Sequence, residues 1–277
     1  MNGAEEDGGI PLLPSVLVFA GVDPSGGAGI AADLQAIAAQ GAHALTVVTA
    51  LTAQDNDRVY AVQPVEPEMV RRQALALTEK IAICAVKIGI TGSADNARVI
   101  AELVVQLRRA QPGLPVVLDT VLASGHGDML SRDDAVQALA PLLPLATLIT
   151  PNGPEAAALA EGATAGRADG DLLDIARAQA EALLKRGCGN VLITGGHGDG
   201  DDVLNCWFGA GGSEQVWRWP RLPGGFHGSG CTLASAIAGL LAQDMPLARA
   251  LAKAQHYCNH SLRSAYAIAA GQYIPRR

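Results

Sequence analysis

The feature that most constrains the fold is a repeated alternation of short apolar runs with longer amphipathic segments. The runs are rich in Val, Ile and Leu and are residues 16–20, 45–51, 85–90, 116–118, 147–149 and 191–194. Between them, the spacing of apolar residues predicts helices near residues 28–40, 67–80, 94–109, 131–140, 153–161 and 171–186. Continuously apolar strands that alternate with helices are typical of a mostly parallel sheet covered on both faces.

The pattern changes after residue 200. Residues 202–208 and 214–219 resemble two strands joined by a glycine-rich turn, so we expect an antiparallel edge there. Two more helices are predicted near residues 229–242 and 246–265. We therefore expect an α/β protein with three layers (α/β/α). Acidic residues and glycines make residues 1–14 a flexible leader, and residues 15–277 show no repeat or linker, which predicts a single domain.

Composition excludes several classes of protein. Hydrophobic residues make up 49% of the 277 residues, too many for a disordered chain, and a net charge of −7 argues against a nucleic-acid partner. Residues 2–9 hold no Lys or Arg, so no secretory signal is expected. Pro141 and Pro144 interrupt the longest apolar stretch, and a membrane span needs roughly 18 uninterrupted residues. We expect no membrane partner.

The cysteines indicate a reducing compartment. Their number is odd and none are spaced C-x-x-C, which favours free thiols over disulfides or a zinc site. They are Cys84, Cys188, Cys206, Cys231 and Cys258. We therefore expect a cytoplasmic protein.

Polar and glycine-rich segments follow five of the apolar runs. They are residues 21–29 (GVDPSGGAG), Thr52 to Asp55, Asp119, residues 150–155 (TPNGPE) and residues 195–197 (GGH). Because ligands bind at the carboxyl ends of strands in open α/β sheets, these segments together predict one site.

The first of these segments, residues 21–29, brings the backbone close to a ligand if its glycines adopt positive φ. It matches neither the dinucleotide fingerprint nor the phosphate-binding P-loop. An ordinary strand-to-helix turn is the alternative. Asp33 lies one turn beyond Gly29 and either faces the site or is an exposed acid.

A second glycine-rich segment, residues 227–232 (HGSGCT), opens an apolar helix. The start of a helix presents unpaired N–H groups and a positive dipole, so Gly228, Ser229 and Gly230 predict an anion site suited to phosphoryl transfer. A cysteine at such a position is expected to have a lowered pKa and to be partly thiolate, which makes Cys231 a functional candidate. The alternative is that Cys231 is a small buried residue.

Asp119 and Glu155 are the candidate metal ligands. Mg²⁺ prefers oxygen ligands and is often held by one or two carboxylates together with substrate phosphates. For Glu155 the alternative is a helix-capping role with Asn152. The histidines outside residues 227–232 show no metal-binding spacing.

Four segments, in order along the chain, resemble the bacterial hydroxymethylpyrimidine and phosphomethylpyrimidine kinases of thiamine biosynthesis, in the ribokinase-like superfamily. They are residues 16–54, VKIGITGS at 86–93, TLITPNGPEA at 147–156 and HGSGCTLASAIAGLLA at 227–242. The resemblance extends from about residue 15 to 265. It implies a ribokinase-like fold, a homodimer, and the use of ATP and Mg²⁺ to phosphorylate 4-amino-5-hydroxymethyl-2-methylpyrimidine and then its monophosphate.

The resemblance also implies a role for each matching residue. The pyrimidine would be bound by Gly21, Asp33, Gln54 and Val121. The metal would lie near Asp119 and Glu155, and the nucleotide near Asn152, Thr194 and Gly196. The anion hole would be Gly228, Ser229 and Gly230, and Cys231 would accept the proton of the hydroxymethyl group.

Three positions depart from the usual family pattern. Ile90 stands where Met is usual, and Thr194 and Gln255 stand where Lys is usual. Because of these three departures, one alternative is that the protein is a catalytically weak member of the family that binds pyrimidines as a sensor. A pyridoxal (vitamin B6) kinase of the same fold is the second alternative, since such enzymes share the glycine-rich segments.

Overall fold

The structure is a computed structural model that describes residues 12–123, 126–128, 130, 133–161, 172–198 and 200–277. The predicted leader, residues 1–14, lies almost wholly outside these ranges. The same is true of residues 131–132, where a helix was expected to begin.

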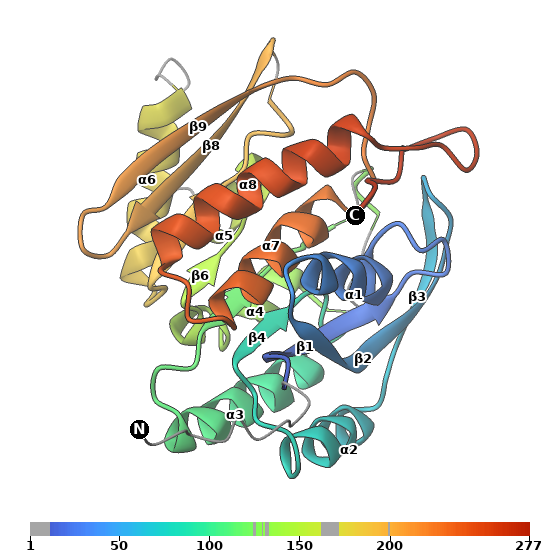
Figure 1. Cartoon of the computed structure of the whole chain (residues 1–277), viewed down its shortest axis with the longest axis vertical. Coiled ribbons are helices and arrows are strands. Elements are labelled where there is room, and N and C mark those ends of the chain that lie inside the picture. Colours follow the sequence, from blue (N-terminus) through green and yellow to red (C-terminus); the bar gives the residue numbers. More distant parts are fainter. Residues whose placement is uncertain (1–11, 124–125, 129, 131–132, 162–171, 199) are drawn as a thin grey trace, which may run out of the picture.

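In the described ranges, nine strands form one sheet in the order β3-β2-β1-β4-β5-β6-β7-β8-β9 (Figure 1). Their bounds are β1 Ser15–Val22, β2 His43–Gln54, β3 Val59–Pro64, β4 Ala85–Ile88, β5 Val116–Leu118, β6 Leu148–Ile149, β7 Asn190–Ile193, β8 Asp202–Gly209 and β9 Glu214–Pro220. The six strands β1, β2 and β4 to β7 are parallel, so their carboxyl ends meet at one edge. The predicted sheet is confirmed.

Both flanks of the sheet are antiparallel, whereas only one was expected. The predicted pair β8–β9 is present, with Asn205 opposite Trp217. On the other flank β3 pairs with β2, placing Leu51 opposite Gln63. Strand β3 was not predicted, although its residues 59–62 (VYAV) are apolar; none of its residues is buried.

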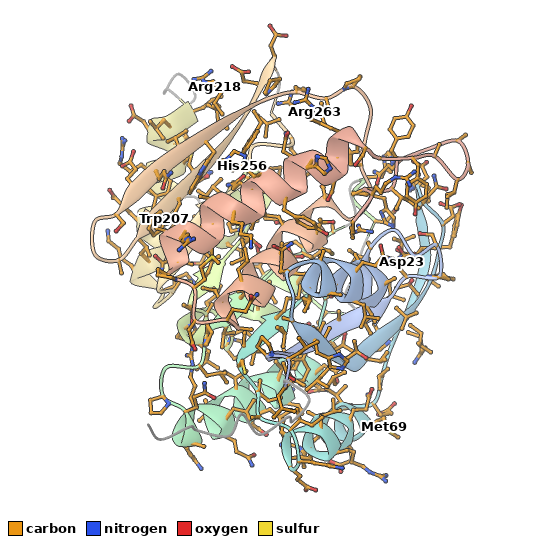
Figure 2. The ribbon with its side chains drawn as sticks, in the orientation of Figure 1. Asp23, Met69, Trp207, Arg218, His256 and Arg263 are labelled. Carbon is orange, nitrogen blue, oxygen red and sulfur yellow. The ribbon has the colours of Figure 1, made fainter. Side chains whose placement is uncertain are left out.

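Helices cover both faces of the sheet. One layer holds α1 (Gly29–Ala39), α7 (Ser229–Leu241) and α8 (Leu247–Arg263), with α7 between the other two (Figure 1). The other layer holds α2 (Pro67–Thr78), α3 (Ala94–Ala110), α4 (Ala135–Leu139), the 3-10 helix η1 (Leu143–Leu145), α5 (Gly153–Leu159) and α6 (Leu172–Lys185). Exposed side chains such as Met69 on α2 and Arg263 on α8 face away from the sheet (Figure 2).

Alternate residues of strand β1, which lies inside the sheet, contact different helical layers. In β1, Leu17 and Phe19 belong to the apolar cluster under α2 to α6, while Val16 and Val18 belong to the cluster under α1, α7 and α8. All four are fully buried. This explains why the strand is apolar throughout.

Helix α7 is buried along nearly its whole length. Every residue from Thr232 to Leu241 is buried, and small residues predominate among them. Small side chains let α1, α8 and the sheet all approach its backbone closely. The segment that carries the predicted anion site is therefore anchored in the interior.

The helix expected near residues 131–140 is shorter, because the Asp134 side chain accepts hydrogen bonds from the N–H groups of Val136 and Gln137 and so caps α4. No helix within the described ranges is long and apolar enough to cross a membrane.

Candidate active site

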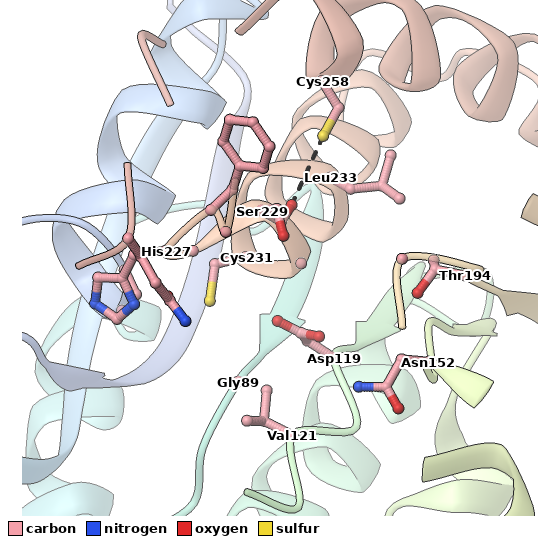
Figure 3. Close-up of a pocket in the computed structure, with 18 of the residues that line it drawn as sticks. Gly89, Asp119, Val121, Asn152, Thr194, His227, Ser229, Cys231, Leu233 and Cys258 are labelled. Carbon is pink, nitrogen blue, oxygen red and sulfur yellow. Dashed lines mark hydrogen bonds between the residues drawn. The ribbon is translucent and has the colours of Figure 1, made fainter. Parts of the chain in front are cut away.

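A cavity of about 570 Å³ opens at the carboxyl ends of the parallel strands. It is lined by every residue predicted for the site except Asp33: Gly21, Gln54, Asp119, Val121, Asn152, Glu155, Thr194, Gly196, Gly228, Ser229, Gly230 and Cys231. In Figure 3, Asp119 lies between Cys231, at the start of α7, and Asn152, at the start of α5. Residues up to 210 positions apart in the chain therefore share one site, as expected for strand ends on one edge.

The start of α7 depends on a left-handed glycine. Gly228 has φ of 78°, and a Cβ at this position would lie 2.1 Å from the carbonyl oxygen of Gly27. The first N–H groups of a helix have no partner within it and carry a partial positive charge. Ser229, Gly230 and Cys231, which line the cavity, supply such groups. The arrangement suits an anion.

A carboxylate joins the two glycine-rich turns. Asp23 accepts hydrogen bonds from the backbone N–H groups of Ser25 (2.8 Å) and Ala28 (2.7 Å), and lies 2.9 Å from Nε2 of His227. Burial alone would raise the pKa of Asp23, but these hydrogen bonds outweigh it and hold the pKa well below its usual value. Asp23 therefore stays ionised, and it fixes the turn after β1 against the turn before α7. Its role was not predicted, although it stands within residues 21–29.

Lys87 is the residue that the sequence analysis missed most clearly. It lies in the apolar strand β4, is fully buried and lines the cavity. Its Nζ lies 2.9 Å from Oδ1 of Asp33 and 3.9 Å from Oδ2 of Asp119. Burial alone would lower the pKa of Lys87, but the Asp33 carboxylate outweighs it and raises the pKa. A lysine inside an apolar run was the available signal, because a buried charge requires a partner.

Asp33 does not line the cavity, so the structure does not place it together with the other residues predicted to bind the pyrimidine. Its carboxylate is fully buried under the cavity floor. Besides the pair with Lys87, its Oδ1 accepts a 2.6 Å hydrogen bond from Ser235. The acid is needed inside the protein because Lys87 has to be neutralised there. Neither of the two positions considered for it, facing the site or exposed, is correct.

The expected thiolate of Cys231 is also corrected. Burial raises the pKa of Cys231 to about 12; the Lys87 ammonium lowers it, and the carboxylates of Asp119 and Asp33 oppose that lowering. A helix N-terminus lowers a thiol pKa most where no carboxylates compete with it. Cys231 is a thiol at neutral pH in this structure.

Glu155 fulfils the capping alternative and lines the cavity as well. Its Oε2 accepts a 2.9 Å hydrogen bond from the N–H of Asn152, while Oδ1 of Asn152 accepts one of the same length from the N–H of Glu155. Burial raises the pKa of Glu155 to about 8. This carboxyl therefore serves the start of α5, and its Oε2 is already engaged by the N–H of Asn152.

Asp119 is the better metal candidate. Its Oδ2 is buried and accepts no hydrogen bond from the described part of the chain, and burial raises its pKa. A Cβ at Gly230 would lie 3.7 Å from its Oδ1, which places the acid beside the anion site. The described residues hold no group of three or more His, Cys, Asp or Glu side chains suited to a metal. One carboxylate completed by substrate phosphates still fits Mg²⁺.

Ile90 and Gln255, two of the residues that depart from the usual family pattern, pack into the walls of the cavity. Ile90 lies against the backbone at Gly21, where a Cβ would lie 2.5 Å from its Cδ1. Gln255 is buried, and its Oε1 accepts a 2.7 Å hydrogen bond from Asn205, whose own Oδ1 accepts one from the N–H of Gly195. Gln255 thus supports the turn after β7 without a charge.

Comparison with known proteins identifies the family. A family model described as phosphomethylpyrimidine kinase matches residues 23–275. The chain belongs to the phosphomethylpyrimidine kinase family. It is 40% identical over 263 residues to the hydroxymethylpyrimidine/phosphomethylpyrimidine kinase of Rhizobium meliloti, covering 92% of this chain and 93% of that protein. The Escherichia coli protein of the same name is 38% identical over 262 residues, with 94% and 95% covered.

Solved structures agree with this assignment to the phosphomethylpyrimidine kinase family. The phosphomethylpyrimidine kinase of Clostridium difficile has a TM-score of 0.74 at 32% identity, over 90% of this chain and 99% of that one. The ADP complex of Bacillus subtilis pyridoxal kinase has a TM-score of 0.81 at 25% identity, over 96% and 97%. The predicted family and the ribokinase-like fold are confirmed.

The buried ion pair leads to a prediction about stability. Replacing Lys87 by Met leaves the Asp33 carboxylate buried without its partner, so we expect a loss of about 3–5 kcal/mol in the free energy of unfolding. Urea denaturation measures it. Arg71, whose ion pair with Glu102 is on the surface, is the control: Arg71→Ala should cost less than about 1 kcal/mol. Adding Asp33→Asn to Lys87→Met should recover part of the loss, and no recovery would contradict the pairing.

Proposed function

We propose that this protein transfers the γ-phosphoryl group of ATP to 4-amino-5-hydroxymethyl-2-methylpyrimidine, and then a second phosphoryl group to the monophosphate. The observation that carries the proposal is the meeting of three features at one cavity: the acid Asp119, whose Oδ2 accepts no hydrogen bond from the described residues, the thiol of Cys231, and the start of α7. Membership of the phosphomethylpyrimidine kinase family supports the substrate class.

The pyrimidine would lie at the ends of β1 and β2. Gly21 lines the cavity there, and Gln54 offers both an amide donor and an acceptor to the ring nitrogens and the exocyclic amino group. Val121 and Ile90 supply apolar contact across the same cavity. ATP would lie toward Asn152, Thr194 and Gly196, with its γ-phosphate near the start of α7. A threonine hydroxyl at 194 donates a hydrogen bond without the charge of the usual lysine.

In the first step, the hydroxymethyl oxygen attacks the γ-phosphorus, a new O–P bond forms and the bond to the β–γ bridging oxygen breaks. ADP departs with the bonding electron pair. The N–H groups of Ser229, Gly230 and Cys231 would neutralise charge on the transferred group. Asp119 would hold Mg²⁺, which when bound neutralises phosphate charge. Cys231 would first release its thiol proton to bulk water, and the resulting thiolate would accept the hydroxyl proton, which restores the thiol.

The second step differs in its nucleophile. A phosphate oxygen attacks instead of an alcohol, and a phosphomonoester with a second pKa of about 6 is already ionised at neutral pH. No proton has to be removed, so Cys231 is needed for the first step and not for the second. The same anion site and the same acid serve both.

A pyridoxal kinase is the second candidate. The high TM-score to the Bacillus subtilis enzyme favours it, although identity to that protein is 25%, against 40% for the Rhizobium meliloti kinase. A sensor with weak catalysis is the third candidate. Its motivation is the uncharged pair Thr194 and Gln255, which face the cavity where lysines are usual.

We further propose a cytoplasmic homodimer. All five cysteines are free thiols, as expected in a reducing compartment. Leu51 and Tyr60 of the β2–β3 flank have exposed fractions of 52% and 70%, and a second copy packed on this flank would cover them. Light scattering on the purified protein measures the oligomeric state.

The first experiment measures ADP release by the purified protein with ATP and Mg²⁺. The alcohol, its monophosphate and pyridoxal are supplied in parallel. We expect turnover with both pyrimidines. Turnover with pyridoxal alone would reassign the pocket, and binding of the pyrimidine without any turnover would support the sensor.

Replacing Cys231 by Ala should separate the two steps. We expect kcat for the alcohol to fall by about 10²-fold or more, since a general base contributes about 10²–10⁴-fold. With the monophosphate as substrate, kcat should fall by less than about 10-fold, because no proton is removed there. The KM of the alcohol should change little. Equal losses in the two steps would show that Cys231 acts by packing or by shaping the anion site.

The rate of the first step should depend on pH. Because burial raises the pKa of Cys231 to about 12, the thiolate fraction grows with pH throughout the accessible range, about tenfold per unit. We therefore expect kcat for the alcohol to rise between about pH 7 and 9, and Cys231→Ala to lack this rise. A flat profile in the unmodified protein would assign the proton to another acceptor.

A further inference from the structure

Residues 265–277 return to the back of the active site after α8. Tyr273 accepts a 2.9 Å hydrogen bond from the N–H of His227 and donates one of the same length to the carbonyl of Gly225. Ile274 is buried and exchanges two hydrogen bonds with Tyr266. This segment is therefore held along the turn that leads into α7.

The segment delivers the guanidinium of Arg277 to the junction of the two glycine-rich turns. Its Nη2 donates to the carbonyl oxygens of Gly27 (2.6 Å) and Gly228 (3.3 Å), and its Nε donates to Oγ1 of Thr232 at 2.8 Å. Its Nη1 is buried and has no hydrogen-bond partner among the described residues. Arg277 is not among the residues that line the cavity, so it lies behind the anion site.

Transfer of a guanidinium from water into this position has an unfavourable free energy, and the hydrogen bonds of Arg277 compensate for it. Burial lowers the pKa of Arg277, although it remains far above neutral pH. The planar guanidinium group has several N–H donors in fixed directions, so it can hold several carbonyl oxygens at fixed positions relative to one another. Helix α7 has no side-chain cap at Gly228. The Gly228 carbonyl accepts hydrogen bonds from the N–H (2.9 Å) and Oγ1 (2.7 Å) of Thr232 within the helix, and Arg277 adds a contact to it from outside the helix.

The contact between Arg277 and the Gly228 carbonyl also affects the orientation of the Ser229 N–H, because both groups belong to one peptide plane. The carbonyl of Gly228 and the N–H of Ser229 belong to one planar peptide group and point in opposite directions. Fixing the carbonyl toward Arg277 therefore fixes the Ser229 N–H away from it, on the cavity side. Gly228 in the left-handed region has no Cβ to restrict its rotation, so an external restraint matters here more than elsewhere.

We propose that Arg277 is a positioning residue, which holds the turn at Gly27 and Gly228 so that the first N–H groups of α7 point at the transferred phosphoryl group. The inference rests on the proposed function of that anion site. It predicts an effect on the rate of transfer, because displaced donors lose transition-state stabilisation. It predicts little effect on pyrimidine binding, because Arg277 does not touch the cavity.

The test compares Arg277→Ala and Arg277→Lys with Arg276→Ala. Arg276 is the matched control because its side chain is exposed and lies over the ring of Tyr266. We expect kcat of Arg277→Ala to fall by about 10-fold or more, with KM for the pyrimidine changed less than about 3-fold. Arg277→Lys, which keeps the charge without the planar fork, should be intermediate. Millimolar ethylguanidinium should restore part of the activity of Arg277→Ala, and Arg276→Ala should match the unmodified protein.

A kcat of Arg277→Ala within about twofold of the unmodified protein would overturn the proposal. If that variant does not fold, Arg277→Lys is judged by the same criterion. Amide exchange of the peptide covering residues 226–233 is the second readout and needs no turnover. It should be faster in both Arg277 variants and unchanged in Arg276→Ala. If the unmodified protein phosphorylates no alcohol, the proposed function fails. In that case the role of Arg277 is judged by amide exchange alone, and equal exchange rates in the Arg277 variants and the unmodified protein would overturn it.

Discussion

The ion pair between Lys87 and Asp33 is the constraint on which the active site depends. One buried ammonium group joins the central strand β4 to α1, and through Ser235 the same acid contacts α7. The Lys87 ammonium also lies 3.9 Å from Asp119, the metal candidate, and it favours the ionised form of that carboxyl. The ion pair also accounts for the glycine at position 89, because a Cβ there would lie 2.8 Å from the Lys87 amino group. The electrostatics of the floor are therefore set by residues that are not expected to touch the substrate.

Above this floor, the anion site is assembled from two separate turns that share their supports. Asp23 ties the first turn to His227, and Gly228 approaches the Gly27 carbonyl so closely that only glycine fits. Neither turn has its observed shape without the other. This explains why both glycine-rich segments occur in one chain although they are about 200 residues apart.

Much of this organisation could be predicted from the sequence, because strand runs and strand ends are local signals. The parallel sheet, its layers and most of the cavity residues follow from them. Strand β3 was missed although residues 59–62 (VYAV) are apolar, because this run is short and is followed within two residues by Pro64. Asp33 and Cys231 were misjudged for another reason. Their properties depend on Lys87 and Asp119, which lie far away in the chain, and on burial that only the assembled structure shows.

The burial of α7 has a mechanical consequence. A helix packed on all sides cannot shift or rotate without repacking the interior, which is as dense as an organic crystal. The phosphoryl-binding end of the site is thus a fixed reference point. Any adjustment to substrates of different size, such as an alcohol and its phosphate ester, falls to the opposite wall, where β2 and β3 form an exposed flank. We therefore expect substitutions in the exposed β2–β3 wall to alter substrate range more readily than substitutions in the buried helix α7.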